Sequence, residues 1–204
     1  MLVTFEGIDG CGKSTQIELL KEYLSKKGYS HHLFREPGGT EISEKIRSLL
    51  LHETKNMAPV TELLLFSAAR SQLVREKIIP LLQENEIVIL DRFYDSTTAY
   101  QGYGRESVSL EDIKAINRIA TKSTVPDVTF YLKISPAEAA RRTSAAEKDR
   151  MENSGITFFE KVASGYDKLA ENSRRYFTID ATKSQEIIHQ DIIEILNSSF
   201  LKEL

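Results

Sequence analysis

The stretch "VTFEGIDGCGKST", Val3 to Thr15, decides the fold class. It opens with β-branched and aromatic residues, which are typical of a buried strand. After it, apolar residues recur at helical spacing up to Gly28. Between the two, Gly7–Ser14 fits the pattern G-x-x-x-x-G-K-[ST]. Glycines let backbone N–H groups converge on phosphate oxygens, and the start of the helix adds positive potential. The stretch therefore predicts a phosphate-binding loop.

The loop pattern assigns a role to individual side chains. Lys13 is expected to reach the β- and γ-phosphates of a nucleotide, and the Ser14 hydroxyl is expected to ligate Mg²⁺. Cys11 occupies an unrestricted position of the pattern and has no base beside it, so we interpret it as a small packing residue. The expected ATP-binding residues here are Gly7, Ile8, Asp9, Gly10, Cys11, Gly12, Lys13, Ser14 and Thr15.

Beyond the loop, short strand-like runs alternate with longer amphipathic segments. Helices are expected over Ser14–Lys27 and over Pro59–Leu82, the second with a break at Pro80. Strands separated by helices predict a parallel sheet with helices on both faces. No linker divides residues 1–204, so we expect a single α/β domain. The strands are expected at Leu2–Glu6, His32–Arg35, Ile87–Leu90, Val128–Ile134 and Tyr176–Ile179.

Composition narrows the possible environments and partners. The net charge of −3 gives no sign of a nucleic-acid-binding surface. No apolar run is long enough to span a membrane, and no signal peptide is apparent. A single cysteine fits a reducing compartment, so the cytoplasm is the expected location. The four histidines show no ligand spacing, and we predict no zinc site.

A phosphate-binding loop is compatible with a switch GTPase, a motor ATPase or a kinase. The chain has no N-K-x-D run of the kind that reads guanine. "VILDR", Val88–Arg92, ends a strand with Asp91, which suits an acid that holds Mg²⁺ through water. An arginine follows it directly, and no glycine stands two places later to sense a γ-phosphate. An arginine beside the loop suits a second phosphate on an acceptor, so the pattern favours a kinase.

Several motifs in a fixed order resemble those of bacterial thymidylate kinases, members of the P-loop nucleoside monophosphate kinase superfamily. They are "FEGIDGCGKST", "REPGGTEISEKIRSLLL", "LLLFSAARSQ", "DRFYDSTTAYQGYGR" and "TIDAT", and they span nearly the whole chain. The resemblance implies a five-stranded parallel sheet, a homodimer, and phosphorylation of dTMP to dTDP with ATP and Mg²⁺. It also places Asp180, Ala181 and Thr182 in a loop that contacts adenine.

The same resemblance supplies a dTMP site. Phe66 and Arg70 are four residues apart and share a helix face; the resemblance implies that Phe66 stacks on thymine and Arg70 bonds its O4. A guanidinium only donates, so it suits thymine O4 and opposes the cytosine amino group. Arg92 is expected to clamp the acceptor phosphate, and Tyr100 to lie where a ribose 2′-hydroxyl would be. The implied dTMP-binding residues are Asp9, Phe66, Arg70, Arg92, Ser96, Thr97, Tyr100 and Gln101.

The catalytic set implied by the resemblance includes a mobile lid over roughly residues 141–155. The resemblance implies that a lid supplies the last cation, and because the phosphate-binding loop has Gly10 and Cys11 and no arginine, the lid must supply it here. Thr143, Ser144 and Ala145 replace a denser basic run, and the sequence leaves open which lid arginine acts. The expected catalytic residues are Asp9, Lys13, Arg92, Arg141, Arg142 and Arg150.

Two other functions remain compatible with the motifs. A deoxynucleoside kinase shares the loop, the D-R motif and a basic lid, but it needs a general base for a hydroxyl group. A non-catalytic nucleotide-binding module is the other alternative. Retention of Lys13, Ser14, Asp91 and Arg92 argues against such a module, because a protein that only binds nucleotide does not need them all.

Overall fold

Five parallel strands form a central sheet in the computed structural model, which describes residues 1–53, 56–106, 108–144, 150–171 and 173–201. The spatial order is β2-β3-β1-β4-β5, with every neighbouring pair parallel. The predicted parallel α/β sheet is thus confirmed, and each predicted strand differs by at most one residue at an end. The strands are β1 (Leu2–Glu6), β2 (His31–Arg35), β3 (Ile87–Asp91), β4 (Val128–Lys133) and β5 (Tyr176–Asp180).

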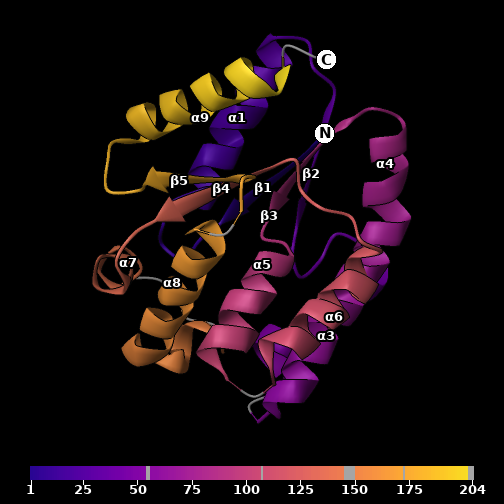
Figure 1. Cartoon of the computed structure of the whole chain (residues 1–204), viewed down its shortest axis with the longest axis vertical. Coiled ribbons are helices and arrows are strands. Elements are labelled where there is room, and N and C mark those ends of the chain that lie inside the picture. The colour runs from indigo at the N-terminus through magenta and orange to yellow at the C-terminus, as the bar shows by residue number, and fades with distance from the viewer. Residues whose placement is uncertain (54–55, 107, 145–149, 172, 202–204) are drawn as a thin grey trace.

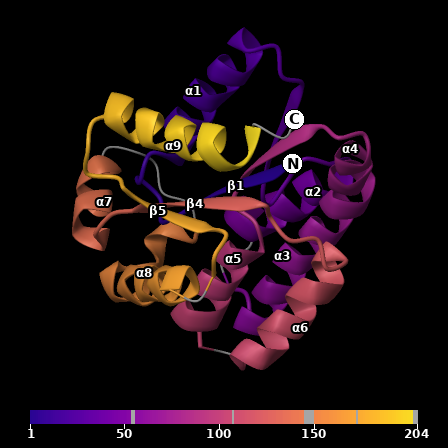
Figure 2. The ribbon, with the colours of Figure 1, turned by 45° about the horizontal axis from the view of Figure 1, so that its top comes forward.

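Helices cover both faces of the sheet (Figures 1 and 2). On one face lie α1 (Lys13–Lys26) and α9 (Gln185–Ser199), which pack on each other. On the other lie α3 (Pro59–Leu73), α5 (Tyr94–Thr97), α6 (Leu110–Thr121) and α8 (Ile156–Glu171). The remaining α-helices of the described chain are α2 (Glu41–Ser48), α4 (Ile79–Gln83) and α7 (Pro136–Arg142). None of the helices in the described ranges combines the length and the apolar character needed to cross a bilayer.

The buried sheet explains why the loop after β1 sits at the centre of the molecule. All five residues of β1 are buried, as expected for an inner strand of a sheet covered on both faces. Its neighbours are β3 and β4, so the chain segments that follow these three strands emerge side by side. In open parallel sheets, ligands bind just outside the carboxyl ends of the strands. The topology therefore places the phosphate-binding loop between Arg92 and the segment leading to α7.

The predicted long helix over Pro59–Leu82 is interrupted, but not at Pro80. α3 ends at Leu73, a π-helical turn spans Val74–Ile78, and α4 follows. Proline lacks an N–H group, and its ring collides with the carbonyl four residues earlier in a regular helix. Widening the turn ahead of Pro80 relieves this collision, and the Ile79 N–H group bonds to the Val74 carbonyl five residues back. The proline thus acts on the turn that precedes it.

Candidate active site

The loop between β1 and α1 owes its shape to glycines in conformations that other residues rarely adopt. Gly7 has φ of 138° and Gly10 has φ of 83°. A Cβ atom on Gly7 would lie 2.7 Å from the Leu132 carbonyl oxygen, and one on Gly10 would lie 2.8 Å from that of Ala139. Any side chain at either position would push the loop away from β4 and α7. Cys11 is buried in the core, consistent with a packing role.

Lys13 and the start of α1 face the space enclosed by the loop. The Lys13 ammonium donates to the Gly7 carbonyl at 3.1 Å and to the Ile8 carbonyl at 3.3 Å, so it lies folded across the loop. Gly12 precedes α1 without a side-chain cap, and the first turn of the helix has no acidic residue. The first amides of α1 are therefore available to an anion, which the helix dipole favours.

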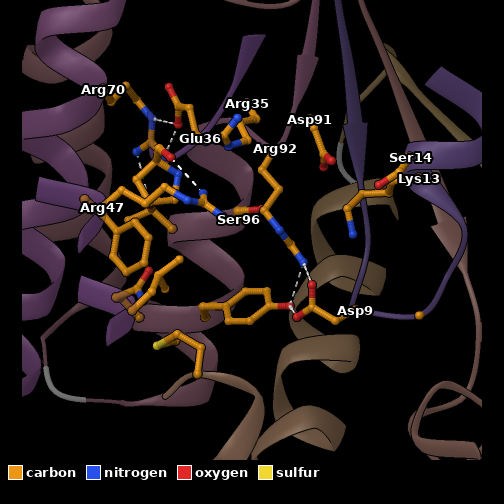
Figure 3. Close-up of a pocket in the computed structure, with 18 of the residues that line it drawn as sticks. Asp9, Lys13, Ser14, Arg35, Glu36, Arg47, Arg70, Asp91, Arg92 and Ser96 are labelled. Carbon is orange, nitrogen blue, oxygen red and sulfur yellow. Dashed lines mark hydrogen bonds and ion pairs between the residues drawn. The ribbon is translucent and has the colours of Figure 1, made fainter. Parts of the chain in front are cut away.

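The arrangement around Asp91 suits a hydrated magnesium ion. Asp91 ends β3 and lines the same cleft as Ser14, whose side chain comes from the first turn of α1 (Figure 3). The Asp91 Oδ1 atom is buried and has no hydrogen-bond partner, an unusual state for a buried carboxylate oxygen. The described residues contain no cluster of three or more His, Cys, Asp or Glu side chains that could cage a metal. A site of one carboxylate and one hydroxyl fits Mg²⁺, which keeps several waters and binds nucleotide phosphates.

Arg92 and Asp9 form an ion pair at the floor of the cleft (Figure 3). The Arg92 Nη2 atom lies 2.6 Å from Asp9 Oδ1, and the Tyr100 hydroxyl donates to Asp9 Oδ2 at 3.2 Å. Burial favours a higher pKa for the Asp9 carboxyl, but the charges of Arg92 and Lys13 outweigh it and lower the pKa to about 2. Asp9 is therefore ionised at neutral pH. Arg92 also has φ of 70°, a strained backbone conformation of the kind found at functional sites.

A second acid, the fully buried Glu6, is linked to Arg92 through two hydroxyl groups. Glu6 accepts the Phe93 amide at 2.8 Å, the Ser96 hydroxyl at 2.6 Å and the Tyr166 hydroxyl at 2.8 Å. Arg92 donates to the Ser96 and Tyr166 hydroxyls in turn. Burial, reinforced by the charge of Asp95, raises the pKa of the Glu6 carboxyl to about 7, against the hydrogen bonds from Ser96 and Tyr166 and the charge of Arg92.

This raised pKa predicts a dependence of folding stability on pH. Between about pH 4.5 and 7 folded Glu6 keeps a proton that the unfolded chain has released, so raising the pH through this window lowers the free energy of unfolding. Glu6→Gln removes the titration, and its stability relative to wild type should rise from pH 5 to pH 8. Urea unfolding of both proteins across that range measures the difference. A difference independent of pH would contradict the assignment.

The loop, Asp91 and Arg92 open into one elongated cleft of about 490 Å³, a size typical of small-molecule sites. Six basic side chains and three acidic ones among the described residues line it, an excess of positive charge that suits anions. The residues expected from sequence that line it are Asp9, Gly10, Gly12, Lys13, Ser14, Thr15, Phe66, Arg70, Asp91, Arg92, Ser96, Thr97, Tyr100, Gln101 and Arg142.

At the far end of the cleft, α3 contributes Phe66 and Arg70. The Arg70 guanidinium is buried and held on every nitrogen. It forms an ion pair with Glu36, with Nη2 2.6 Å from Oε2, and donates to the Thr97 hydroxyl at 2.8 Å. Its longest contact is 3.4 Å, from Nη1 to the Asn117 amide oxygen. Arg70 is thus a rigidly placed group of donors with one weak bond.

Several expected site residues lie outside the cleft lining. Gly7, Ile8 and Cys11 form the back of the loop. Asp180 ends β5, and Ala181 and Thr182 follow it at the same edge of the sheet. Arg141 extends into solvent. Arg150 instead lies beside Glu62, with Nη1 2.7 Å from Oε2, and donates to the Leu50 carbonyl. Of the expected lid, residues 145–149, including Ala145, lie outside the described residues.

Sequence reasoning assigned no individual role to Arg35, Glu36 and Pro37 of the quoted "REPGGT" motif, which line the cleft, nor to four further residues in or behind it. Arg47 of α2 lines it and donates to the Pro37 carbonyl at 2.8 Å. Leu51 and Met151 contribute apolar surface, and buried Glu62 lies behind Gln101. Of these four, Arg47 and Leu51 had a usable signal, because both lie within the quoted "REPGGTEISEKIRSLLL" segment. The others become neighbours of the cleft only through the tertiary fold.

The cleft has a phosphate-binding loop at one end, the Arg92–Asp9 ion pair beside it, and Phe66 with the fixed donors of Arg70 at the other end. This is the architecture of a P-loop nucleoside monophosphate kinase.

Comparison with known proteins identifies the family within this class. A family model described as thymidylate kinase matches residues 5–192. The chain is 48% identical over 195 residues to the thymidylate kinase of Thermoanaerobacter sp. (strain X514), covering 95% of this chain and 96% of that protein. It is 49% identical over 209 residues to that of Chlorobaculum tepidum, with 97% of each covered. The crystal structure of thymidylate kinase from Ehrlichia chaffeensis matches with a TM-score of 0.80 and 34% identity, covering 96% of this chain and 98% of that one. The chain belongs to the thymidylate kinase family.

Proposed function

We propose that this protein transfers the γ-phosphoryl group of ATP to the 5′-phosphate of dTMP, giving dTDP and ADP. The observation that carries the proposal is a single cleft with the P-loop at one end, Phe66 and Arg70 at the other, and Arg92 between them. Two nucleotides bound in this way would meet with their phosphates at Arg92. Phosphoryl transfer requires mainly such alignment and neutralisation of charge.

On the donor side, the ATP phosphates bind the loop amides and the N-terminus of α1, and Lys13 leaves the Gly7 and Ile8 carbonyls to bind the β- and γ-phosphates. Ser14 would hold Mg²⁺, and Asp91 would hold it through water; the buried Asp91 Oδ1 atom without a hydrogen-bond partner supports this. The ion, when bound, neutralises charge on the β- and γ-oxygens. Asp180, Ala181 and Thr182 border the adenine.

On the acceptor side, Arg92 binds the dTMP phosphate, and Ser96, Thr97, Tyr100 and Gln101 border its base and sugar. Phe66 stacks on thymine, and Arg70 gives O4 the Nη1 hydrogen that now makes the long bond to Asn117. A phosphate dianion is already nucleophilic, whereas a nucleoside hydroxyl needs a general base. Asp9, with a pKa of about 2, is a poor base. This favours a monophosphate acceptor over a nucleoside.

The segment over roughly residues 141–155 acts as the lid, and Arg142 supplies the cation for the transferring phosphoryl group. Arg142 lines the cleft near the loop, whereas Arg150 is paired with Glu62. The lid belongs to the one P-loop domain formed by residues 1–204. The single cysteine supports a reducing, cytoplasmic setting.

The acceptor class is tested by ADP release with ATP, Mg²⁺ and each of dTMP, thymidine, dCMP and UMP. We expect rapid release with dTMP, much slower release with dCMP and UMP, and none above background with thymidine. Turnover of thymidine in preference to dTMP would identify a deoxynucleoside kinase. Nucleotide binding without any turnover would identify a binding module.

The protein also forms a homodimer through α3 and α6. These helices pack together and leave large apolar side chains exposed: Val60 and Leu64 on α3, and Leu110 and Ile119 on α6. Val60 and Leu64 lie one turn apart, on the side of α3 away from Phe66. Light scattering should give twice the 23.1 kDa mass of one chain, and Leu64→Glu should lower it toward one chain. A monomeric wild type would contradict this.

A further inference from the structure

A buried acid on α3 lies behind the base end of the cleft. Glu62, Phe66 and Arg70 are spaced by four residues and share one face of α3. Phe66 and Arg70 line the cleft, whereas Glu62 is 1% exposed and does not line it. Burying a carboxylate is costly unless it is paired and hydrogen-bonded. The groups that pair with the Glu62 carboxylate therefore indicate what role it has.

Two arginines and one amide satisfy the Glu62 carboxylate. Arg105 Nε lies 3.3 Å from Oε1, and Arg150 Nη1 lies 2.7 Å from Oε2. Gln101 donates through Nε2 to Oε1 at 2.9 Å. Burial favours a higher pKa for Glu62, but the bond from Gln101 and the charges of Arg105 and Arg150 outweigh it and lower the pKa. At neutral pH the carboxylate is ionised and only accepts hydrogen bonds.

An acceptor-only partner determines the orientation of the Gln101 amide. A glutamine amide has one donor side and one acceptor side, and in isolation the two can exchange by a flip. The NH₂ group must face Glu62, because two acceptors in contact would repel each other. No described residue donates to the Gln101 Oε1 atom. Gln101 lines the cleft, so its oxygen is the polar atom that it offers to a ligand.

We infer that Glu62 is a positioning residue for base selection, which orients Gln101 so that its amide oxygen meets the N3–H group of thymine. The inference rests on the proposed function. Thymine presents a donor at N3 beside an acceptor at O4, whereas cytosine presents an acceptor at N3 beside an amino donor. Arg70 as donor and Gln101 as acceptor match thymine at both atoms and oppose cytosine at both. Arg105 and Arg150 contribute by keeping Glu62 ionised.

The test compares kcat/KM for dTMP with kcat/KM for 5-methyl-dCMP, which differs from dTMP only on the base edge. Glu62→Gln keeps the shape of the side chain but offers both a donor and an acceptor, so Gln101 can flip. We expect the dTMP preference to fall by about tenfold. Because the contact forms before the chemical step, the loss for dTMP should appear in KM, with kcat little changed. If Glu62 had a purely structural role, Glu62→Gln would lower kcat/KM for both substrates equally and leave their ratio unchanged.

Three further variants sharpen the result. Gln101→Ala leaves Glu62 and its arginines in place and should narrow the same ratio by a similar factor, so it tests the inference even if Glu62→Gln folds poorly. In the Gln101→Ala background, Glu62→Gln should cause no further change. Glu76→Gln removes one exposed carboxylate beyond α3, outside the cleft lining, and should leave the ratio unchanged.

An unchanged ratio in Glu62→Gln or in Gln101→Ala, with wild-type dTMP kinase activity intact, overturns the inference and leaves the proposed function standing. Absence of dTMP turnover in the wild type would instead overturn the proposed function itself.

Discussion

Arg142→Ala is expected to lower kcat with dTMP by roughly 10³–10⁵-fold, the effect of removing an arginine that stabilises a transferring phosphoryl group. The loop between β1 and α1 has no arginine to fill this role. Arg142 lines the cleft beside the loop and is held by Glu138, with Nε 2.9 Å from Oε1. Its charge acts on the transition state, so KM for ATP should change much less than kcat.

The neighbouring arginine is a matched control. Arg141 also bonds to Glu138, yet its side chain is 73% exposed compared with 31% for Arg142, and it does not line the cleft. Arg141→Ala should stay within about tenfold of wild type, a change of about 1.4 kcal/mol in the barrier. Single-turnover rates for both variants separate the chemical step from product release. A larger loss in Arg141→Ala than in Arg142→Ala would reassign the catalytic cation.

Lys13→Ala is expected to lower kcat by about 10²-fold or more while the protein stays folded. The Lys13 ammonium lies across the loop within reach of its carbonyls, where the β- and γ-phosphates of ATP would bind. A fixed cation stabilises charge that grows in the transition state more than charge already present in the ground state. Steady-state kinetics with dTMP, together with far-UV circular dichroism, measure the two properties.

Lys21→Ala provides the control for the loss of a lysine from α1. Lys21 lies on the same helix but pairs with Glu18 on the exposed side, at 2.7 Å. Its substitution should leave kcat within twofold or so, because a surface ion pair contributes little. Wild-type turnover in a folded Lys13→Ala protein would contradict the role assigned to the loop.

Most of the fold was predictable because its signals are local. The inner strands β1 and β3 are short, buried, largely apolar runs, and the loop pattern identifies which strand is central. Two helix starts also carry local signals: Ser109 and Ser135 accept the amides three residues later, and Pro136 takes the first helical position. The interruption of the Pro59–Leu82 helix was misplaced, because the strain of Pro80 is relieved by a π-turn that leaves no residue signature of its own.

The candidate site was predictable only where motifs carried it. The loop residues, Asp91 and Arg92 lie together because the sheet order brings β1 beside β3. Arg150 shows the limit of sequence reasoning: by composition it is one of three similar arginines, but its pairing with Glu62 joins residues 88 positions apart. The same holds for Glu62 and Gln101, whose contact depends on how the segment over 98–104 packs near α3.

The central claim is that the cleft holds two nucleotides so that the 5′-phosphate of dTMP attacks the γ-phosphate of ATP. It is tested most directly by following the label from ATP that carries ³²P at the γ-position, with dTMP as acceptor and Mg²⁺ present. We predict that the label appears in the β-phosphate of dTDP, in an amount equal to the ADP formed, and that inorganic phosphate stays at background. Label released chiefly as inorganic phosphate, or, in a parallel assay with thymidine as acceptor, label transferred to thymidine when none reaches dTMP, would contradict the account.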